Sequence, residues 1–515
     1  MPAHAVHLLP RPVRLTVQPG AFRLGPATAL RATPGAEAAA ALLRELLAPA
    51  TGLPLPPSPT GRITLALDPV LTGLGREGYG ITAGPEAVLL RAATPAGLRH
   101  AVQTLRQLLP PAALSAAPVR GARWEIPCVQ ITDAPKLPWR GLMVDVARHF
   151  QPARYLHRLI DLLALHRMNV LHLHLTDDQG WRMPVAAYPK LTEIGGHRAR
   201  TVVGPGGSGV YDDTPHGGSY TRAELTALTA HAAARGVTLL PEIDLPGHTR
   251  AALAAYPELG ADPGRHLPVW DDWGVSPHIL GVHDRALDFC RTVLDEVCDA
   301  FPGAPVHIGG DECPDDAWRT SPDALRRVAD EGLTGPRALH PWFVGRLADH
   351  LHGLGRTPVA WAEDDRTMPE GTVLMPWRDA AHGLPAARRG HDVVATPFRT
   401  TYLDYPETDD PAEPRAQAGD PLTLRAVQAH DPVPADWEPA AAARVTGTQA
   451  QLWSEYLPTA AHLEYRAFPR LCALAESAWS GPAAWPDFVR RLGPHRVRLD
   501  ALGVRPHPPT REETV

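Results

Sequence analysis

From residue 136 onward, short apolar runs alternate with helical stretches, and this order constrains the fold more than any other feature of the sequence. Helical patterns fall at 152–167, from Thr221 onward, at 286–301 and at 463–479. The apolar runs between them are typical of buried strands, at 141–146, 170–175, 238–243, 306–308, 358–361, 373–375, 393–395 and 447–452. Eight such strands with intervening helices predict an α/β fold, a (β/α)8 TIM barrel.

The first 135 residues follow a less regular order. Helical patterns at 36–47 and 96–109 lie among strand patterns at 14–17, 29–33, 62–67, 80–93 and 129–131. We therefore expect a smaller α+β domain with a mainly antiparallel sheet at 1–135, a catalytic barrel at 136–502, and a C-terminal tail at 503–515. Gly73-x-Gly75-x-x-Gly78 is followed by a strand and not by a helix, so we interpret it as a turn rather than a dinucleotide site.

Composition excludes several kinds of chemistry and partner. Lys136 and Lys190 are the only lysines, and no lysine-containing phosphate loop exists. The formal net charge of −6 gives no reason to expect nucleic acid or an anionic membrane as partner. The N-terminus has no signal-peptide pattern, and no apolar run is long enough for a membrane span. We therefore expect a cytoplasmic protein, either a monomer or a homodimer.

Five cysteines are scattered along the chain without a CxxC pair. Their odd number and spacing argue against a disulfide framework and against a zinc–thiolate site. The five are Cys128, Cys290, Cys298, Cys313 and Cys472.

Polar side chains gather where the predicted strands end. Because the C-terminal ends of barrel strands meet at one face, where such enzymes build their active sites, we expect these side chains to form one site. They are Asp145, Arg148 and His149; His172, His174, Asp177 and Asp178; Glu242, Asp244 and His248; Asp311 and Glu312; Trp361 and Glu363; Trp377 and Arg378; and Gln451, Trp453 and Glu455.

The adjacent acids Asp311 and Glu312 carry the strongest functional signal. Gly309 and Gly310 precede them and permit close backbone approach and unusual dihedral angles. Both acids face one ligand only if the strand ends before them. Two carboxyl groups in different surroundings suit glycoside cleavage. Tryptophans at three strand ends suit the apolar face of a sugar or an acetamido methyl group, with core packing as the alternative: Trp361, Trp377 and Trp453.

Two other classes of function remain open from the residues alone. His172 and His174 lie on one face of a predicted strand, as the ligands of a hydrolytic metal centre would, and Glu242, Asp244 and His248 are further candidate ligands. A carbohydrate-binding protein without catalytic activity would use the tryptophans and arginines but would not need the two acids.

The order of motifs along almost the whole chain resembles the family 20 glycoside hydrolases, which are β-N-acetylhexosaminidases. The matching stretches are 140–150, 168–182, 241–248, 307–312, 402–404 and 452–455. The resemblance implies an accessory α+β domain, a catalytic barrel, and an enzyme without metal or organic cofactor. It implies a small or oligosaccharide substrate with a terminal β-linked N-acetylhexosamine. It does not separate GlcNAc from GalNAc, and it does not give the natural aglycone or the chain length.

The resemblance also implies a retaining, substrate-assisted mechanism, in which the substrate's acetamido oxygen attacks the anomeric carbon and forms an oxazolinium ring. Glu312 would protonate the leaving group and then activate water, which requires a raised pKa. Asp311 would orient the acetamido nitrogen, and Tyr402 would hydrogen-bond its carbonyl oxygen.

The remaining site residues would surround these three. By the same resemblance, the three tryptophans wall the acetamido pocket, while sugar hydroxyls bind Arg148, Asp404 and Glu455. Asp177 and His248 would tune Glu312, with Asp244 supporting His248. Residues 405–435 are rich in Pro and Asp and predict an extended loop that shapes the leaving-group side.

Overall fold

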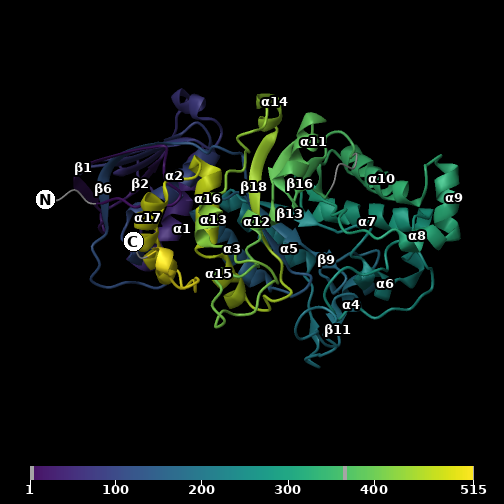
Figure 1. The fold of residues 1–515 in the computed structure, drawn as a ribbon. Coiled ribbons are helices and arrows are strands. Elements are labelled where there is room, and N and C mark those ends of the chain that lie inside the picture. The colour runs from purple at the N-terminus through teal and green to yellow at the C-terminus, as the bar shows by residue number, and fades with distance from the viewer. Residues whose placement is uncertain (1–4, 364–367, 514–515) are drawn as a thin grey trace.

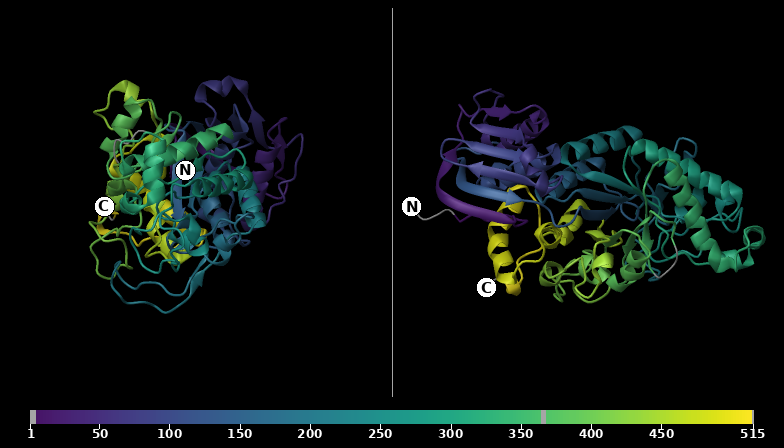
Figure 2. Two further views of the ribbon diagram at one scale, coloured as in Figure 1. Left: turned by 90° about the vertical axis from the view of Figure 1, so that its right-hand side faces the viewer. Right: turned by 90° about the horizontal axis from the view of Figure 1, so that it is seen from above.

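The computed structural model describes residues 5–363 and 368–513. The molecule is elongated, with the N-terminal sheet at one end and helices α8 (Asp316–Thr320) and α9 (Pro322–Asp330) at the other (Figures 1 and 2). Both chain ends lie at the end that holds the N-terminal sheet, because the last long helix, α17 (Trp485–Ala501), returns to it. Arg491 and Arg498 of α17 donate to the carbonyl oxygens of Leu8 and His7.

The N-terminal domain is a six-stranded sheet with the order β1-β6-β4-β5-β3-β2, covered by two helices. The sheet is mixed. Strand β1 pairs with β6, β6 with β4 and β4 with β5 in antiparallel fashion, whereas β5 pairs with β3 and β3 with β2 in parallel. Strand β4 directly follows the glycine motif at 73–78, which confirms that the motif is a turn. The elements are β1 (Arg14–Arg23), β2 (Leu30–Ala32), α1 (Glu37–Thr51), β3 (Ile63–Leu67), β4 (Tyr79–Ala83), β5 (Val88–Ala92), α2 (Pro95–Leu108) and β6 (Glu125–Asp133).

The second domain is a closed, parallel eight-stranded barrel, as predicted. All eight predicted strands are present, although β14 has only two residues. The strands are largely buried because helices cover the outer side of the barrel and the side chains that point inward fill its inside. The strands are β7 (Trp139–Asp145), β8 (Val170–His174), β13 (Thr238–Glu242), β14 (Val306–His307), β15 (Pro358–Ala362), β16 (Val373–Pro376), β17 (Val393–Ala395) and β18 (Val445–Leu452).

Long helices follow most of the barrel strands. The helix predicted from Thr221 onward is present, and Thr221 and Glu224 form a capping box at its start. The predicted helix at 463–479 is instead two helices, since Pro469, which has no N–H to donate, lies between them. The helices of the outer layer are α3 (Ala153–Leu165), α5 (Arg222–Arg235), α7 (Asp284–Ala300), α10 (Leu339–Gly353), α11 (Gly383–Arg388), α15 (Ala460–Ala467) and α16 (Arg470–Ser480).

Shorter elements lie in the loops above the barrel. The segment at 405–435 is mostly irregular but contains α13, a short helix that the sequence did not predict. The loop elements are β9 (Thr176–Asp177), β10 (Gly180–Trp181), α4 (Lys190–Glu193), β11 (His197–Arg198), β12 (His216–Gly217), α6 (Arg250–Ala255), α12 (Phe398–Thr401), α13 (Leu424–Gln428) and α14 (Pro439–Ala442).

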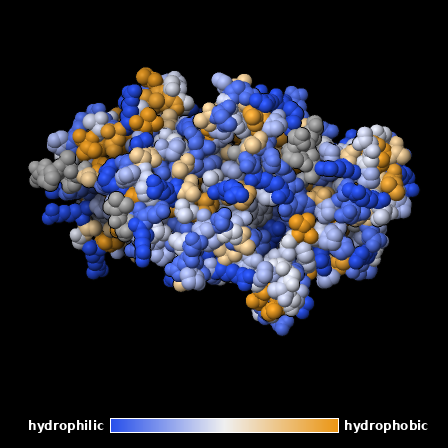
Figure 3. All heavy atoms as spheres, viewed as in Figure 1, coloured by the Kyte–Doolittle hydropathy of each residue, from blue (hydrophilic) through white to orange (hydrophobic). Residues whose placement is uncertain are grey.

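The surface is mainly polar. On the face in Figure 3, apolar side chains form small separate groups rather than one broad patch. Among the helices of residues 5–363 and 368–513, none combines the length and apolar character needed to cross a membrane.

Candidate active site

A cavity of about 170 Å³ opens at the C-terminal ends of the barrel strands. Its lining brings together every residue to which the family resemblance gave a role except Trp361, from segments that are far apart in the sequence. The lining residues are Arg148, Asp177, Asp244, His248, Asp311, Glu312, Trp377, Tyr402, Asp404, Tyr405, Gln417, Trp453 and Glu455.

Trp361 lies beneath the cavity and not in its lining, so its place as a wall of the acetamido pocket stays a prediction. It is 4% exposed and donates its indole N–H to Glu242 Oε1 at 2.7 Å. Its ring lies 6.0 Å from that of Trp453, which does line the cavity. Because position 361 is inside strand β15, its side chain supports the floor of the pocket.

The backbone around the two acids has the unusual geometry that the glycines predicted. Gly309 and Gly310 have φ values of 64° and 91°, and a Cβ atom on Gly309 would lie 1.7 Å from Asp244 Oδ1. Glu312 itself has φ 42°, an uncommon conformation for a residue with a side chain. Strand β14 ends at His307, so the next residues are free to turn and present Asp311 and Glu312 to the same cavity.

The carboxylate of Glu312 lies between two cationic side chains. His248 Nε2 is 3.6 Å from Oε2, and Arg378 Nη2 is 3.6 Å from Oε1. The contact with His248 lowers the pKa of Glu312, the charge of Arg378 lowers it further, and burial opposes both. The expected raised pKa is therefore wrong for the free enzyme, because the sequence did not reveal that two cations meet at this carboxylate.

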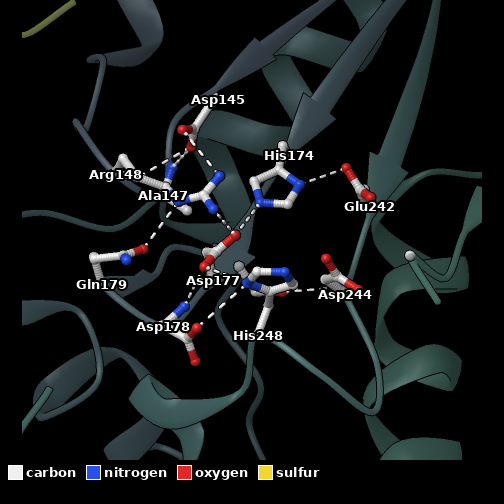
Figure 4. A network of polar contacts seen from close by, with 12 residues as sticks. Asp145, Ala147, Arg148, His174, Asp177, Asp178, Gln179, Glu242, Asp244 and His248 are labelled. Atoms are coloured by element: carbon white, nitrogen blue, oxygen red, sulfur yellow. Dashed lines mark hydrogen bonds and ion pairs between the residues drawn. The ribbon is translucent and has the colours of Figure 1, made fainter. Parts of the chain in front are cut away.

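A network of buried carboxylates keeps His248 charged (Figure 4). His248 Nδ1 is 3.2 Å from Asp177 Oδ1 and 3.3 Å from Asp178 Oδ2. Burial disfavours the imidazolium form, but these carboxylates outweigh it and raise the pKa of His248 well above its ordinary value. Asp177 also contacts Arg148 Nη2 and His174 Nε2, each at 2.8 Å.

Asp244 has a different place from the one predicted. The carboxylates that contact His248 Nδ1 are Asp177 and Asp178, whereas Asp244 Oδ1 accepts the backbone N–H of Gly310 at 3.2 Å. Asp244 therefore supports the turn that leads to Asp311 more directly than it supports His248.

Asp311 is a buried carboxyl with an open acceptor. It is 7% exposed, and its Oδ1 has no hydrogen-bond partner among the described residues. Burial raises the pKa of Asp311 to about 7, while the charge of His248 opposes the rise and that of Glu312 adds to it. Adjacent acids thus have opposite shifts, as a pair with two different tasks requires.

Aromatic and polar groups occupy different parts of the cavity. The rings of Tyr402 and Trp377 stack with centroids 6.3 Å apart, and the Trp453 ring is 6.3 Å from Tyr402. Asp404 is buried and Glu455 beside it is partly buried, and removal from water raises the pKa of each. Neither Asp404 oxygen has a partner among the described residues, so both are available to donors from a ligand.

Two residues near the cavity were not predicted for the site, and two others were predicted there without a role. Gln417, from the segment at 405–435, donates to Glu455 Oε1 at 3.4 Å, and Tyr405 lines the same side. This segment therefore reaches Asp404 and Glu455. Glu363 Oε2 accepts the backbone N–H of Glu312 at 3.2 Å and pairs with Arg378. The strand-end pattern contained Glu363 and Arg378, but no sequence signal marked Gln417.

Three residues of the metal alternative, His172, His174 and Glu242, contact one another below the cavity, whereas Asp244 and His248 line it. Glu242 Oε2 lies 3.0 Å from His172 and 2.5 Å from His174, while Oε1 lies 2.9 Å from His307 and accepts from Trp361. Several groups of buried His and acidic side chains approach closely enough to hold an ion, among them His172, Glu242 and His307. Both Glu242 oxygens already have cationic or N–H partners, which favours a hydrogen-bonded support for Trp361 over a catalytic metal centre.

Comparison with known families gives an independent result. Residues 137–482 match glycosyl hydrolase family 20, catalytic domain, and residues 5–134 match glycosyl hydrolase family 20, domain 2. A β-hexosaminidase of Porphyromonas gingivalis is 34% identical over 99% of this chain. The chain spans 65% of the length of that relative.

Solved structures agree with this result. An exo β-N-acetylglucosaminidase from Vibrio harveyi, in complex with N-acetylglucosamine, has a TM-score of 0.86 at 33% identity and covers 99% of this chain and 80% of its own. The β-N-acetylhexosaminidase from Streptomyces coelicolor A3(2) has a TM-score of 0.84 at 33% identity over 98% of this chain and 97% of its own.

The fold and the site define a barrel glycosidase, and the matches specify which one: the chain belongs to glycosyl hydrolase family 20. The prediction of the β-N-acetylhexosaminidase family is therefore confirmed, and the relatives above are named as β-hexosaminidases and β-N-acetylhexosaminidases.

Proposed function

We propose that this protein removes terminal, β-linked N-acetylhexosamine from glycosides by a retaining, substrate-assisted mechanism. The observation that carries the proposal is the pair of acids with opposite surroundings, Glu312 beside two cations and Asp311 buried with an open acceptor. The complex of the Vibrio harveyi relative with N-acetylglucosamine supports a sugar of this class as the substrate.

In the first step, the acetamido oxygen attacks the anomeric carbon while Glu312 gives its proton to the leaving oxygen. Positive charge develops on the acetamido nitrogen, and Asp311 Oδ1 accepts its N–H. Tyr402 donates to the acetamido oxygen, and Trp377 and Trp453 enclose the methyl group. In the second step, ionised Glu312 takes a proton from water, which opens the oxazolinium ring with net retention.

This chemistry needs a proton on Glu312 and none on Asp311, which is the reverse of the balance in the free site. In the free site Asp311 holds the proton more tightly, because its pKa is about 7 whereas that of Glu312 is lowered. A bound sugar changes both preferences, since its N–H stabilises ionised Asp311 and its bulk removes water from Glu312. The substrate itself therefore moves the site into its reactive protonation state.

The test is a panel of nitrophenyl glycosides. We expect hydrolysis of N-acetyl-β-glucosaminide and N-acetyl-β-galactosaminide, little hydrolysis of the β-glucoside that lacks the acetamido group, and no change with EDTA. Loss of activity with EDTA that zinc restores would favour the metal alternative, and binding of N-acetyl sugars without turnover would favour a carbohydrate-binding protein.

A cytoplasmic location is a second proposal. Four cysteines, Cys128, Cys290, Cys298 and Cys472, are buried free thiols, which suits a reducing compartment. Fractionation of the native cells tests it, and recovery of the mature protein outside the cytoplasm would contradict it.

A further inference from the structure

Arg378 lies next to Glu312 and is held there by two contacts, one with Glu363 and one with Trp377 of the cavity lining. Its Nη2 atom is 2.8 Å from Glu363 Oε1, and its guanidinium carbon lies 4.2 Å from the centre of the Trp377 ring. From this position, the same Nη2 atom is 3.6 Å from Glu312 Oε1. A guanidinium fixed on both an aromatic ring and a carboxylate keeps its charge in one place.

Glu363 links this cation to the backbone of the acid. While its Oε1 pairs with Arg378, its Oε2 accepts the N–H of Glu312 at 3.2 Å. Glu312 has φ 42°, so this hydrogen bond stabilises a backbone conformation that residues with side chains seldom adopt. Glu363 therefore contacts both the main chain of Glu312 and Arg378, and Arg378 in turn lies beside the carboxylate of Glu312.

The charged groups that face Glu312 come from several barrel strands. His248 follows β13, Arg378 follows β16 and Arg148 follows β7, and their positive charges oppose those of Asp311 and Glu363. The side chain of His248 is only 3% exposed, whereas that of Arg378 is 49% exposed. Arg378 is therefore the cation whose influence on Glu312 depends on solvent and on salt.

We propose that Arg378 is a positioning residue that sets the balance of Glu312 between proton donor and base. This inference rests on the proposed function of Glu312. The positive charge beside Oε1 favours the ionised carboxylate, which makes Glu312 a stronger acid toward the leaving group and a weaker base toward water. The pair with Glu363 keeps that charge beside Oε1 throughout the cycle.

The test compares pH profiles of kcat, which report ionisations in the enzyme–substrate complex, for three variants on a nitrophenyl N-acetyl-β-glucosaminide. Arg378→Gln removes the charge, Arg378→Lys keeps it, and Arg389→Gln removes an exposed charge away from the site. In Arg378→Gln we expect the limb at high pH, where Glu312 loses its proton, to move up by about 0.5 to 1 pH unit. Arg378→Lys should leave the limb close to its wild-type position, and Arg389→Gln should not move it. In 1 M salt the difference between the wild type and Arg378→Gln should be smaller.

A high-pH limb that stays in place in an active Arg378→Gln enzyme would overturn this inference alone, since a merely structural role lowers rates without moving the limb. A wild-type protein without hexosaminidase activity would overturn the proposed function as well. If Arg378→Gln fails to fold, Arg378→Met keeps the apolar contact with Trp377 and gives the same reading.

Discussion

Asp133 at the joint between the domains and Asp404 at the mouth of the barrel are both buried aspartates with opposite surroundings. Asp133 Oδ1 accepts from the indole of Trp479 and the N–H groups of Val13 and Ala134, each at 3.0 Å. Its Oδ2 accepts from Tyr79 at 2.6 Å and pairs with Arg167. Asp404 has no hydrogen-bond partner on either oxygen among the described residues.

The difference shows where this chain uses its buried charge for folding and where it keeps it for a ligand. A carboxylate whose acceptors are all filled stabilises the structure, whereas an empty buried acceptor costs free energy until a donor arrives. The joint should therefore determine stability, and the rim should determine activity. Substitutions at the joint and at the rim should therefore have different consequences.

The largest effect should come from Glu312→Gln at the rim. We expect hydrolysis of sugar or alkyl aglycones to fall by about 10² to 10⁴-fold, because the amide cannot donate the proton that these leaving groups need. A dinitrophenyl aglycone leaves with little protonation, so its release should fall much less. Steady-state rates across a series of leaving groups measure this difference.

The matched variant is Asp311→Asn, which changes a neighbouring carboxylate in the same way. Asp311 acts on the acetamido nitrogen during ring closure, so its loss should slow every leaving group by a similar factor. Equal losses for both variants across all leaving groups would show that the division of roles is wrong.

At the joint, Asp133→Ala should destabilise the protein by about 3 to 5 kcal/mol, because it leaves the buried guanidinium of Arg167 without its partner. Thermal unfolding measures the loss, with Asp409→Ala on the exposed loop at 405–435 as the control. We expect a clear drop in Tm and nearly unchanged KM in the molecules that remain folded. A Tm equal to that of the control would show that the contacts of Asp133 do not stabilise the folded protein.

The smallest effect should be a gain in stability from Asp311→Asn. Above pH 4 an unfolded Asp311 ionises, but the folded one keeps its proton until about pH 7. Ionisation therefore favours the unfolded state increasingly from pH 4 to 7 and constantly above it. The variant should match the wild type near pH 4 and be more stable than the wild type at pH 8, by less than the loss expected for Asp133→Ala.

The control for this gain is Asp145→Asn. Asp145 accepts from the backbone N–H groups of Ala147, Arg148 and Ser454, so its amide variant should be less stable at pH 8. Tm values for both variants at pH 4 and pH 8 decide the sign. A loss of stability in Asp311→Asn at pH 8 would mean that its carboxylate is satisfied in the folded state.

Periodicity and strand-end residues were sufficient to predict the barrel. Alternating runs gave all eight strands, and the pair of glycines before Asp311 signalled the turn that the structure contains. Such features are local, because a strand or a turn depends on residues that are neighbours in the chain.

Features that depend on distant residues were not predicted. The pKa of Glu312 depends on His248 and Arg378, whose approach is set by three different strands. The depth of Trp361 depends on its bond to Glu242, and Gln417 reaches Glu455 through a segment without regular structure. In each case the sequence gives the type of the residue, but the residues that contact it are known only once the barrel strands are arranged in space.

The central claim, that the substrate's own acetamido group is the nucleophile, has a direct test. Aryl β-glucosaminides with mono-, di- and trifluoroacetyl groups on the nitrogen carry progressively weaker carbonyl nucleophiles but nearly the same shape. We predict that kcat/KM falls steeply with each added fluorine, because the carbonyl oxygen forms its bond in the first step. A rate that stays constant across the series would show that a protein group or a water molecule attacks the anomeric carbon instead.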